Sequence, residues 1–187
     1  MLEANWPVIS NSIKFDPTGK VPQPFIKLAV QEMFRDTFPG RGVKAKFFDK
    51  FDPKNSHLLP AIIHKVHQAK ITGKQSVEIW GDGSARREFM YIEDLADAIY
   101  FALESISDIP DLMNIGVGTD YTIKEYYESV ALVVGWQGEF VFDYSKPTGM
   151  AQKLSDTSLQ LKWGWQPKTT LKEGIRSTYK YYLENVF

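Results

Sequence analysis

An indole and two guanidinium groups flank a glycine-rich turn near the middle of the chain. Trp80 ends an apolar run, residues 81–84 read Gly-Asp-Gly-Ser, and Arg86 and Arg87 follow. These turn residues tolerate tight conformations, and glycine also accepts positive φ angles. An indole can stack on a flat ring, and a guanidinium can bind anionic oxygens in pairs. This hairpin-like bend is therefore predicted to bind a flat, anionic ligand.

The elements on either side of the bend must position these side chains. Val77, Ile79 and Trp80 predict a strand, because β-branched and aromatic residues suit a pleated, half-buried surface. After the arginines, acidic residues in a first turn and apolar residues at helical spacing predict a helix. Its predicted apolar face consists of Leu95, Ile99, Ala102, Leu103 and Ile106.

Further helices are predicted before and after the bend. Asn55 or Ser56 can cap a helix whose buried face is Leu59, Ile62, Ile63, Val66 and Ala69, with His64 and His67 facing solvent. Two capping boxes, Thr122 to Glu125 and Thr170 to Glu173, open two more helices. The inner face predicted for the last helix is Leu171, Ile175, Tyr179, Tyr182 and Leu183.

Shorter elements complete the prediction. Residues 112–117 and 139–143 are expected to be strands, and residues 157–162 a short helix. Residues 25–34 predict an amphipathic helix that stops at Pro39-Gly40, after an irregular, proline-containing start.

Composition excludes several classes of function. The net charge of -1 argues against nucleic acid as a partner, because backbone phosphates need a concentrated positive surface. No long apolar run or secretory signal occurs, so a cytoplasmic protein without a membrane segment is expected. The chain has no cysteine, and its three histidines lack the companions of a metal site.

Several ordered motifs together resemble the carboxyl-terminal, substrate-binding half of the GDP-L-fucose synthase family. They are Trp-Gly-x-Gly at Trp80, Arg-Glu-Phe at Arg87, and an acidic Asp-Leu-Ala helix at Leu95. Residues 55–61, 114–118 and 142–147 follow the family order as well. The resemblance implies an α/β, Rossmann-type, extended short-chain dehydrogenase/reductase fold. It divides the chain into an unrecognised segment, 1–46, and a GDP-sugar-binding domain, 47–187.

The resemblance also implies roles for five residues. His57 aligns with a proton-donating histidine, Lys65 and Arg87 with basic residues at the substrate diphosphate, Trp80 with a nucleotide platform, and Asp156 with a substrate-contacting aspartate. Four of the five have a plainer alternative. His57 could be a surface residue, Trp80 a core aromatic, Arg87 a solvated charge or a partner of nearby acids, and Asp156 a helix cap.

Two parts of the family's reductase machinery do not occur in these 187 residues. No glycine-rich G-x-G-x-x-G turn is present, and none of the nine tyrosines has a lysine four positions later. The family uses NADP(H), so cofactor binding by this chain alone is not expected. A complementary Rossmann half or a homodimer is an expected partner.

The resulting prediction is the GDP-sugar-binding half of an NADPH-dependent GDP-4-keto-6-deoxy-D-mannose 3,5-epimerase/4-reductase. Two alternatives stay open at this point. One is a non-catalytic module that binds a nucleotide sugar or a partner. The other is a fragment of a related UDP- or dTDP-sugar epimerase or dehydratase, although Trp-Gly-x-Gly with Arg-Glu-Phe favours the GDP branch.

Overall fold

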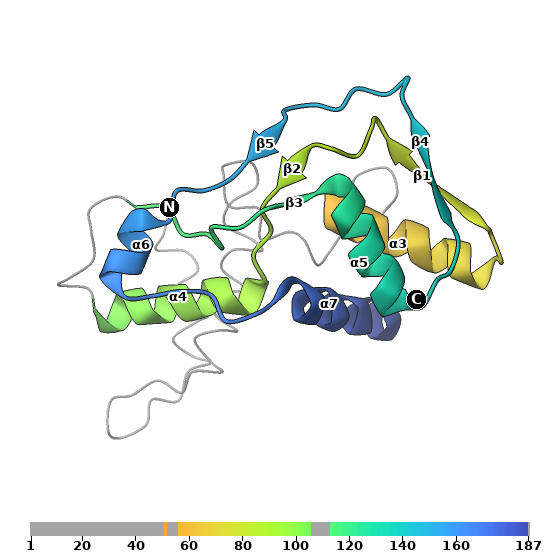
Figure 1. The fold of residues 1–187 in the computed structure, drawn as a ribbon. Coiled ribbons are helices and arrows are strands. Elements are labelled where there is room, and N and C mark those ends of the chain that lie inside the picture. The colour runs from red at the N-terminus through yellow and green to blue at the C-terminus, as the bar shows by residue number, and fades with distance from the viewer. Residues whose placement is uncertain (1–50, 52–55, 106–112, 187) are drawn as a thin grey trace, which may run out of the picture.

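The computed structural model describes residue 51, residues 56–105 and residues 113–186, so the helix predicted at 25–34 lies outside the described residues. Helices and short strands alternate along this part of the chain (Figure 1). The helices are α3 Leu58–Ile71, α4 Ile92–Glu104, α5 Ile123–Val134, α6 Ser158–Trp163 and α7 Leu171–Asn185. The strands are β1 Ser76–Trp80, β2 Arg86–Arg87, β3 Tyr121–Thr122, β4 Glu139–Asp143 and β5 Gln152–Lys153.

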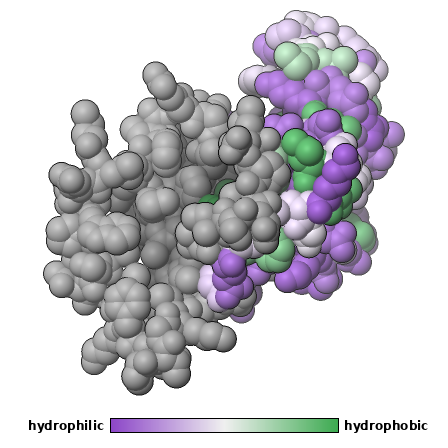
Figure 2. All heavy atoms as spheres, turned by 90° about the vertical axis from the view of Figure 1, so that its left-hand side faces the viewer, coloured by the Kyte–Doolittle hydropathy of each residue, from purple (hydrophilic) through white to green (hydrophobic). Residues whose placement is uncertain are grey.

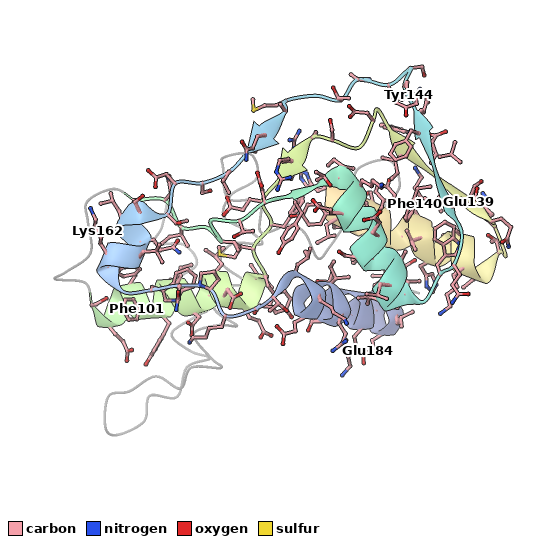
Figure 3. The ribbon with its side chains drawn as sticks, viewed as in Figure 1. Phe101, Glu139, Phe140, Tyr144, Lys162 and Glu184 are labelled. Carbon is pink, nitrogen blue, oxygen red and sulfur yellow. The ribbon has the colours of Figure 1, made fainter. Side chains whose placement is uncertain are left out.

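The hydrophobic core lies where α3, α5 and α7 pack together beside β1 and β4 (Figure 1). Ile62 and Val66 from α3, Val130 from α5 and Ile175 from α7 are almost completely buried in this core. Because their apolar residues recur every three or four positions, each helix presents a continuous stripe to its neighbours. Figure 3 shows Phe140 on β4 beside α5, where its ring packs edge-to-face against Tyr127.

The described strands form two small sheets, β1–β4 and β3–β2–β5, whose strands are interleaved along the chain. β1 and β4 pair in parallel, and alternate residues of β1 are exposed and buried, as the sequence predicts. β2 lies between β3, which is antiparallel to it, and β5, which is parallel. The backbone N–H of Gly81 donates to Asp143 at 2.9 Å, and that of Arg86 donates to Ala151 at 2.7 Å. The bend after Trp80 is therefore not a hairpin, because it carries the chain from one sheet to the next beside the β4–β5 connection.

A second, smaller packing unit joins α4 to α6 (Figure 3). The ring of Phe101 on α4 meets Trp163 of α6 edge-on, with centroids 4.7 Å apart. The buried carboxylate of Asp94 accepts the backbone N–H groups of Lys168 and Thr169, which lead into α7. The described surface on this side is mostly hydrophilic with small hydrophobic areas (Figure 2). Within the described residues no helix combines the length and apolar character needed to cross a bilayer.

Both predicted capping boxes are confirmed. The side chains of Thr122 and Glu125 bond each other's backbone N–H groups at the start of α5, and Thr170 and Glu173 do the same at the start of α7. The prediction for α3 is wrong in one respect, because its N-cap is His57, whose side chain makes no capping bond. The buried face of α7 also differs from the prediction, since Leu183 is 43% exposed.

The strand predicted at 112–117 does not form in the part that is described, residues 113–117. Its backbone groups are used by side chains instead. Gly116 exchanges two hydrogen bonds with the Gln160 amide, and Val117 donates to Glu88. The backbone hydrogen-bonding groups of this segment are thus satisfied by side chains, although its residues are typical of a strand. Local strand propensity alone does not predict such partners.

The prediction that His64 and His67 face solvent is wrong as well. His67 is only 4% exposed, and its Nδ1 lies 2.9 Å from the Tyr179 hydroxyl. His64 Nδ1 lies 3.0 Å from the Tyr182 hydroxyl. Both tyrosines belong to α7, which covers this side of α3. Burial lowers the pKa of both histidines below their usual value, because a desolvated imidazolium is disfavoured.

Acid should therefore destabilise the contact between α3 and α7. A histidine pKa that is lower in the folded state stabilises the fold above the unfolded value of 6.5, and this contribution is lost as pH falls through the folded-state value. We expect thermal unfolding scans to show a melting temperature that drops below pH 6.5 and a shallower drop in the His64→Gln/His67→Gln double variant. His57→Gln, at an exposed position, should keep the wild-type profile. An unchanged profile in the double variant would contradict this assignment.

Candidate functional site

Trp80 presents an indole at the end of β1. Its side chain is 62% exposed, so the alternative of a core aromatic is wrong. The indole N–H donates to the Glu78 carboxylate at 2.9 Å, and the Lys146 ammonium lies 5.8 Å from the ring centroid. The ring is thus held by a neighbour on its own strand and attracts a cation, while most of its surface stays accessible.

Arg87 lies in β2 with its backbone fixed and part of its guanidinium engaged. The Tyr126 hydroxyl donates to its carbonyl at 2.8 Å. Nη1 donates to the carbonyl oxygens of Arg86 at 2.6 Å and Met150 at 2.7 Å. Its Nε and Nη2 donate to no acceptor among the described residues. The guanidinium is therefore held in place by neutral acceptors, so its positive charge is not neutralised by any carboxylate among them.

One loop, residues 144–150, borders both Trp80 and Arg87; we call it the 144–150 loop. Lys146 lies over the indole, Thr148 packs against Gly81, and Met150 accepts from the guanidinium. Figure 3 shows Tyr144 where this loop leaves β4, and its side chain is 76% exposed. The loop therefore contacts Trp80 through Lys146 and Arg87 through Met150, four positions further along.

Arg86 has a structural role that differs from that of its neighbour. Its Nε donates to the Asp120 carboxylate at 2.8 Å, and Nη2 donates to the Asp120 carbonyl at 2.9 Å. Gln152 donates to the other carboxylate oxygen at 2.6 Å. Hydrogen bonds from Gln152 and Arg86 lower the Asp120 pKa, so this buried carboxylate stays ionised. Arg86 thereby ties β2 to the residue that precedes β3.

Glu88 is the residue that the sequence analysis missed. Its Oε1 accepts the backbone N–H groups of Val117 at 2.5 Å and Gly118 at 2.8 Å, and its Oε2 accepts that of Ser155 at 2.8 Å. Glu88 follows Arg87 directly, and Ser155 precedes Asp156. The position of Glu88 within the Arg-Glu-Phe motif could have pointed to this residue. The motif alone does not predict which backbone N–H groups its carboxylate accepts.

Lys65 is engaged elsewhere. Its ammonium donates to the Glu78 carbonyl at 2.5 Å and lies 5.9 Å from the centre of the Tyr127 ring. Burial lowers the Lys65 pKa, and the charge of Glu78 opposes this shift. Lys65 therefore tethers α3 to β1, two residues before Trp80, and would have to leave this carbonyl to reach a phosphate.

His57 and Asp156 belong to neither β1 nor β2, the strands that carry Trp80 and Arg87. His57 is exposed at the N-cap of α3. The Asp156 carboxylate accepts from the backbone N–H of Ser158 at 2.9 Å and from its hydroxyl at 2.5 Å, which lowers the Asp156 pKa. The N-cap of α6 is Thr157, whose side chain makes no capping bond, so the alternative of Asp156 as the helix cap is wrong by one residue. Asp156 instead bonds Ser158, the first residue of that helix. Its second carboxylate oxygen accepts no hydrogen bond from the described residues.

Two glycine turns among the described residues do not fit the pyrophosphate of a dinucleotide. The Gly81–Gly83 turn leads into β2 rather than into a helix, and a Cβ on either glycine would meet Thr148 or Phe142. The N–H groups of residues 116–118 already bond Gln160 and Glu88. Neither turn offers the free amides at a helix start that a pyrophosphate needs. Gly40-Arg41-Gly42 lies outside the described residues, which contain no cluster of metal-binding side chains.

Comparison with known proteins shows which family this chain resembles. Residues 41–116 match the NAD dependent epimerase/dehydratase family. The chain is 55% identical over 135 residues to a GDP-L-fucose synthase from Azorhizobium caulinodans, covering 72% of this chain and 43% of that protein. It is 52% identical over 136 residues to a GDP-L-colitose synthase from Yersinia pseudotuberculosis, covering 73% and 44% respectively.

A solved structure agrees with these relatives. MlghC, a GDP-mannoheptose C4 reductase from Campylobacter jejuni with NADP bound, is 37% identical to the chain with a TM-score of 0.60. The match covers 70% of this chain and 46% of that one. The predicted α/β fold class and the resemblance to GDP-L-fucose synthases are confirmed, and the chain spans less than half the length of each of these relatives. The boundary at residues 46 and 47 stays a prediction.

Gly116 offers a test of the packing around Glu88. A Cβ at this position would lie 2.6 Å from Glu88 Oε1 and 2.8 Å from Ser155 Cβ, so the neighbours would have to move. We expect Gly116→Ala to lower the free energy of unfolding by about 1–3 kcal/mol, measured by urea denaturation.

Gly174→Ala is the matched control. This glycine lies within α7, and its added Cβ would meet side chains at ordinary distances of 3.6 and 3.7 Å. Alanine in a helix interior should leave stability unchanged or raise it by up to about 1 kcal/mol. Equal stability of Gly116→Ala and the wild type would show that the close approach is not required.

Proposed function

We propose that this chain, a partial-length member of the NAD dependent epimerase/dehydratase family, binds a GDP-sugar as the substrate half of a GDP-sugar epimerase and reductase. The relatives named above carry GDP-L-fucose, GDP-L-colitose and GDP-mannoheptose in their names, which supports a guanine nucleotide. The observation that carries the proposal is that one loop, residues 144–150, contacts both the exposed indole of Trp80 and the guanidinium of Arg87.

Physical chemistry assigns a part of the ligand to each side chain. The Trp80 indole is a flat, accessible surface on which a purine can stack. The Arg87 guanidinium retains donors and a positive charge for the diphosphate, and charge-assisted hydrogen bonds are the stronger kind. Lys146, over the indole, can approach the same phosphates, since its cation–π contact with an exposed ring is weak.

The other predicted residues enter as parts of this proposal. Lys65 would add a second cation at the diphosphate after leaving the Glu78 carbonyl. Asp156 would accept hydrogen bonds from the nucleoside through the carboxylate oxygen that Ser158 does not use. His57, exposed at the start of α3, would donate a proton to the sugar during epimerisation.

The reaction of the whole assembly would be epimerisation at carbons 3 and 5 of a GDP-4-keto-6-deoxyhexose, then reduction of the keto group. NADPH supplies the hydride when it is bound. The residues of this chain would bind and orient the sugar nucleotide, and His57 would supply a proton. Cofactor binding falls to a complementary Rossmann half, because the described turns do not fit a dinucleotide.

Calorimetric titration with GDP tests the binding proposal. We expect GDP to bind, and Arg87→Ala to weaken that binding by roughly tenfold or more, which corresponds to the loss of a charge-assisted contact. Trp80→Ala should weaken binding as well, because the stacking surface is removed.

Arg176→Ala removes the same charge from an exposed position on α7 and is the control, with affinity expected to match the wild type. UDP is the competing ligand. Equal affinity for UDP would favour a UDP-sugar relative, whereas no binding of either nucleotide would refute the proposal.

An assay of NADPH oxidation tests separately whether this chain can carry out hydride transfer without a complementary Rossmann half. The isolated chain, supplied with NADPH and a GDP-4-keto-6-deoxyhexose, should give no decrease in absorbance of the reduced cofactor. A full-length relative in the same cuvette is the positive control. Turnover by the isolated chain would show that it holds hydride-transfer machinery which its described residues do not display.

A further inference from the structure

We infer that Glu88 is a positioning residue, whose carboxylate fills an anion site made of three backbone N–H groups and thereby fixes Arg87 and Asp156 in one arrangement. The inference rests on the proposed function for its ligand and on hydrogen bonds in the structure for its geometry. The N–H groups of Val117, Gly118 and Ser155 converge on the two carboxylate oxygens at 2.5–2.8 Å.

These donors come from two segments that are far apart in the sequence. Val117 and Gly118 follow α4, whereas Ser155 lies between β5 and α6. Successive backbone N–H groups that point to one place form an anion-binding concavity, which is the arrangement seen at residues 117 and 118. In this protein the anion is supplied by the chain itself.

The surroundings show that the anion site has little room to adjust. A Cβ on Gly116 would approach Glu88 Oε1 to 2.6 Å, so only glycine allows the segment to come this close. Gln160 is 1% exposed and bonds both the N–H and the carbonyl of Gly116, which holds the same segment from the α6 side. The carboxylate therefore meets a braced backbone rather than a movable loop.

Glu88 and Ser155, which the carboxylate links, are each adjacent in sequence to a proposed ligand-binding residue. Arg87 precedes Glu88, and its carbonyl is held by the Tyr126 hydroxyl at 2.8 Å. Asp156 follows Ser155, and its own carbonyl accepts from Asn114 at 3.2 Å. Without the Glu88 carboxylate, three N–H groups would lose their acceptor, and the spacing between Arg87 and Asp156 would no longer be fixed.

Chemical rescue tests the role of the carboxylate. In Glu88→Ala the anion site is vacated, so we expect GDP affinity to fall roughly tenfold, as for loss of a set of charged hydrogen bonds. Acetate or propionate should restore part of that affinity, whereas chloride at equal ionic strength should not. The wild type should respond to neither carboxylate.

Two further variants keep the test decisive. Glu88→Gln keeps the size of the side chain but faces an N–H group with its own amide donor, so GDP binding should weaken without recovery in acetate. Glu128→Ala removes a carboxylate that is half exposed on α5 and paired with Lys124, and should bind GDP as the wild type does. Wild-type affinity in Glu88→Gln would overturn the inference even if Glu88→Ala did not fold.

A readout independent of GDP separates this inference from the proposed function. The backbone amide proton resonances of residues 117, 118 and 155 should shift in Glu88→Ala and return toward wild-type positions with acetate. If the wild type binds no GDP but these resonances behave as stated, the proposed ligand is wrong and the anion site stands. If GDP binds and Glu88→Ala changes neither affinity nor resonances, the positioning role is refuted.

Discussion

The contact between the Glu88 carboxylate and three backbone N–H groups is the constraint on which the candidate site depends. A backbone segment that leaves regular structure must find partners for its N–H and C=O groups, since an unpaired buried group is costly. Here a single side chain next to Arg87 serves residues 117–118 and Ser155 together. Two segments that share no strand or helix are thereby held at a fixed distance from β2.

The site itself lies along two connections rather than inside one element. The segment that connects β1 to β2 runs beside the segment that connects β4 to β5. Backbone hydrogen bonds from Gly81 and Arg86 join the two segments. Loops between regular elements are where proteins place binding residues, because a rigid scaffold can hold them while their side chains stay accessible. Trp80 and Arg87 are instead the last residues of β1 and β2, at the ends of these connections, and the α3–α5–α7 core beside β1 and β4 is the scaffold.

Four basic residues near this region divide into two kinds by their partners. Arg86 pairs with the buried Asp120, and Lys65 bonds the Glu78 carbonyl, so both contribute to the fold first. Arg87 and Lys146 meet neutral carbonyls and an aromatic face, so their charge is available to an anion. The division explains why adjacent arginines of one motif need not share a function, since the acceptor opposite each guanidinium decides which charge is neutralised.

The sequence by itself determined the local elements: β1, β4 and the two capped helices α5 and α7 are confirmed because strand alternation and capping boxes act over a few residues. It also singled out Trp80 and Arg87 as candidate ligand-binding residues through a motif, and that assignment stays a prediction. Only the tertiary structure decided that residues 113–117 are not a strand, that His64 and His67 are covered by α7, and that Glu88 organises the site. Each of these depends on partners about 30 to 120 positions away, and no local pattern states which distant segment will supply a hydrogen-bond acceptor or cover a helix face.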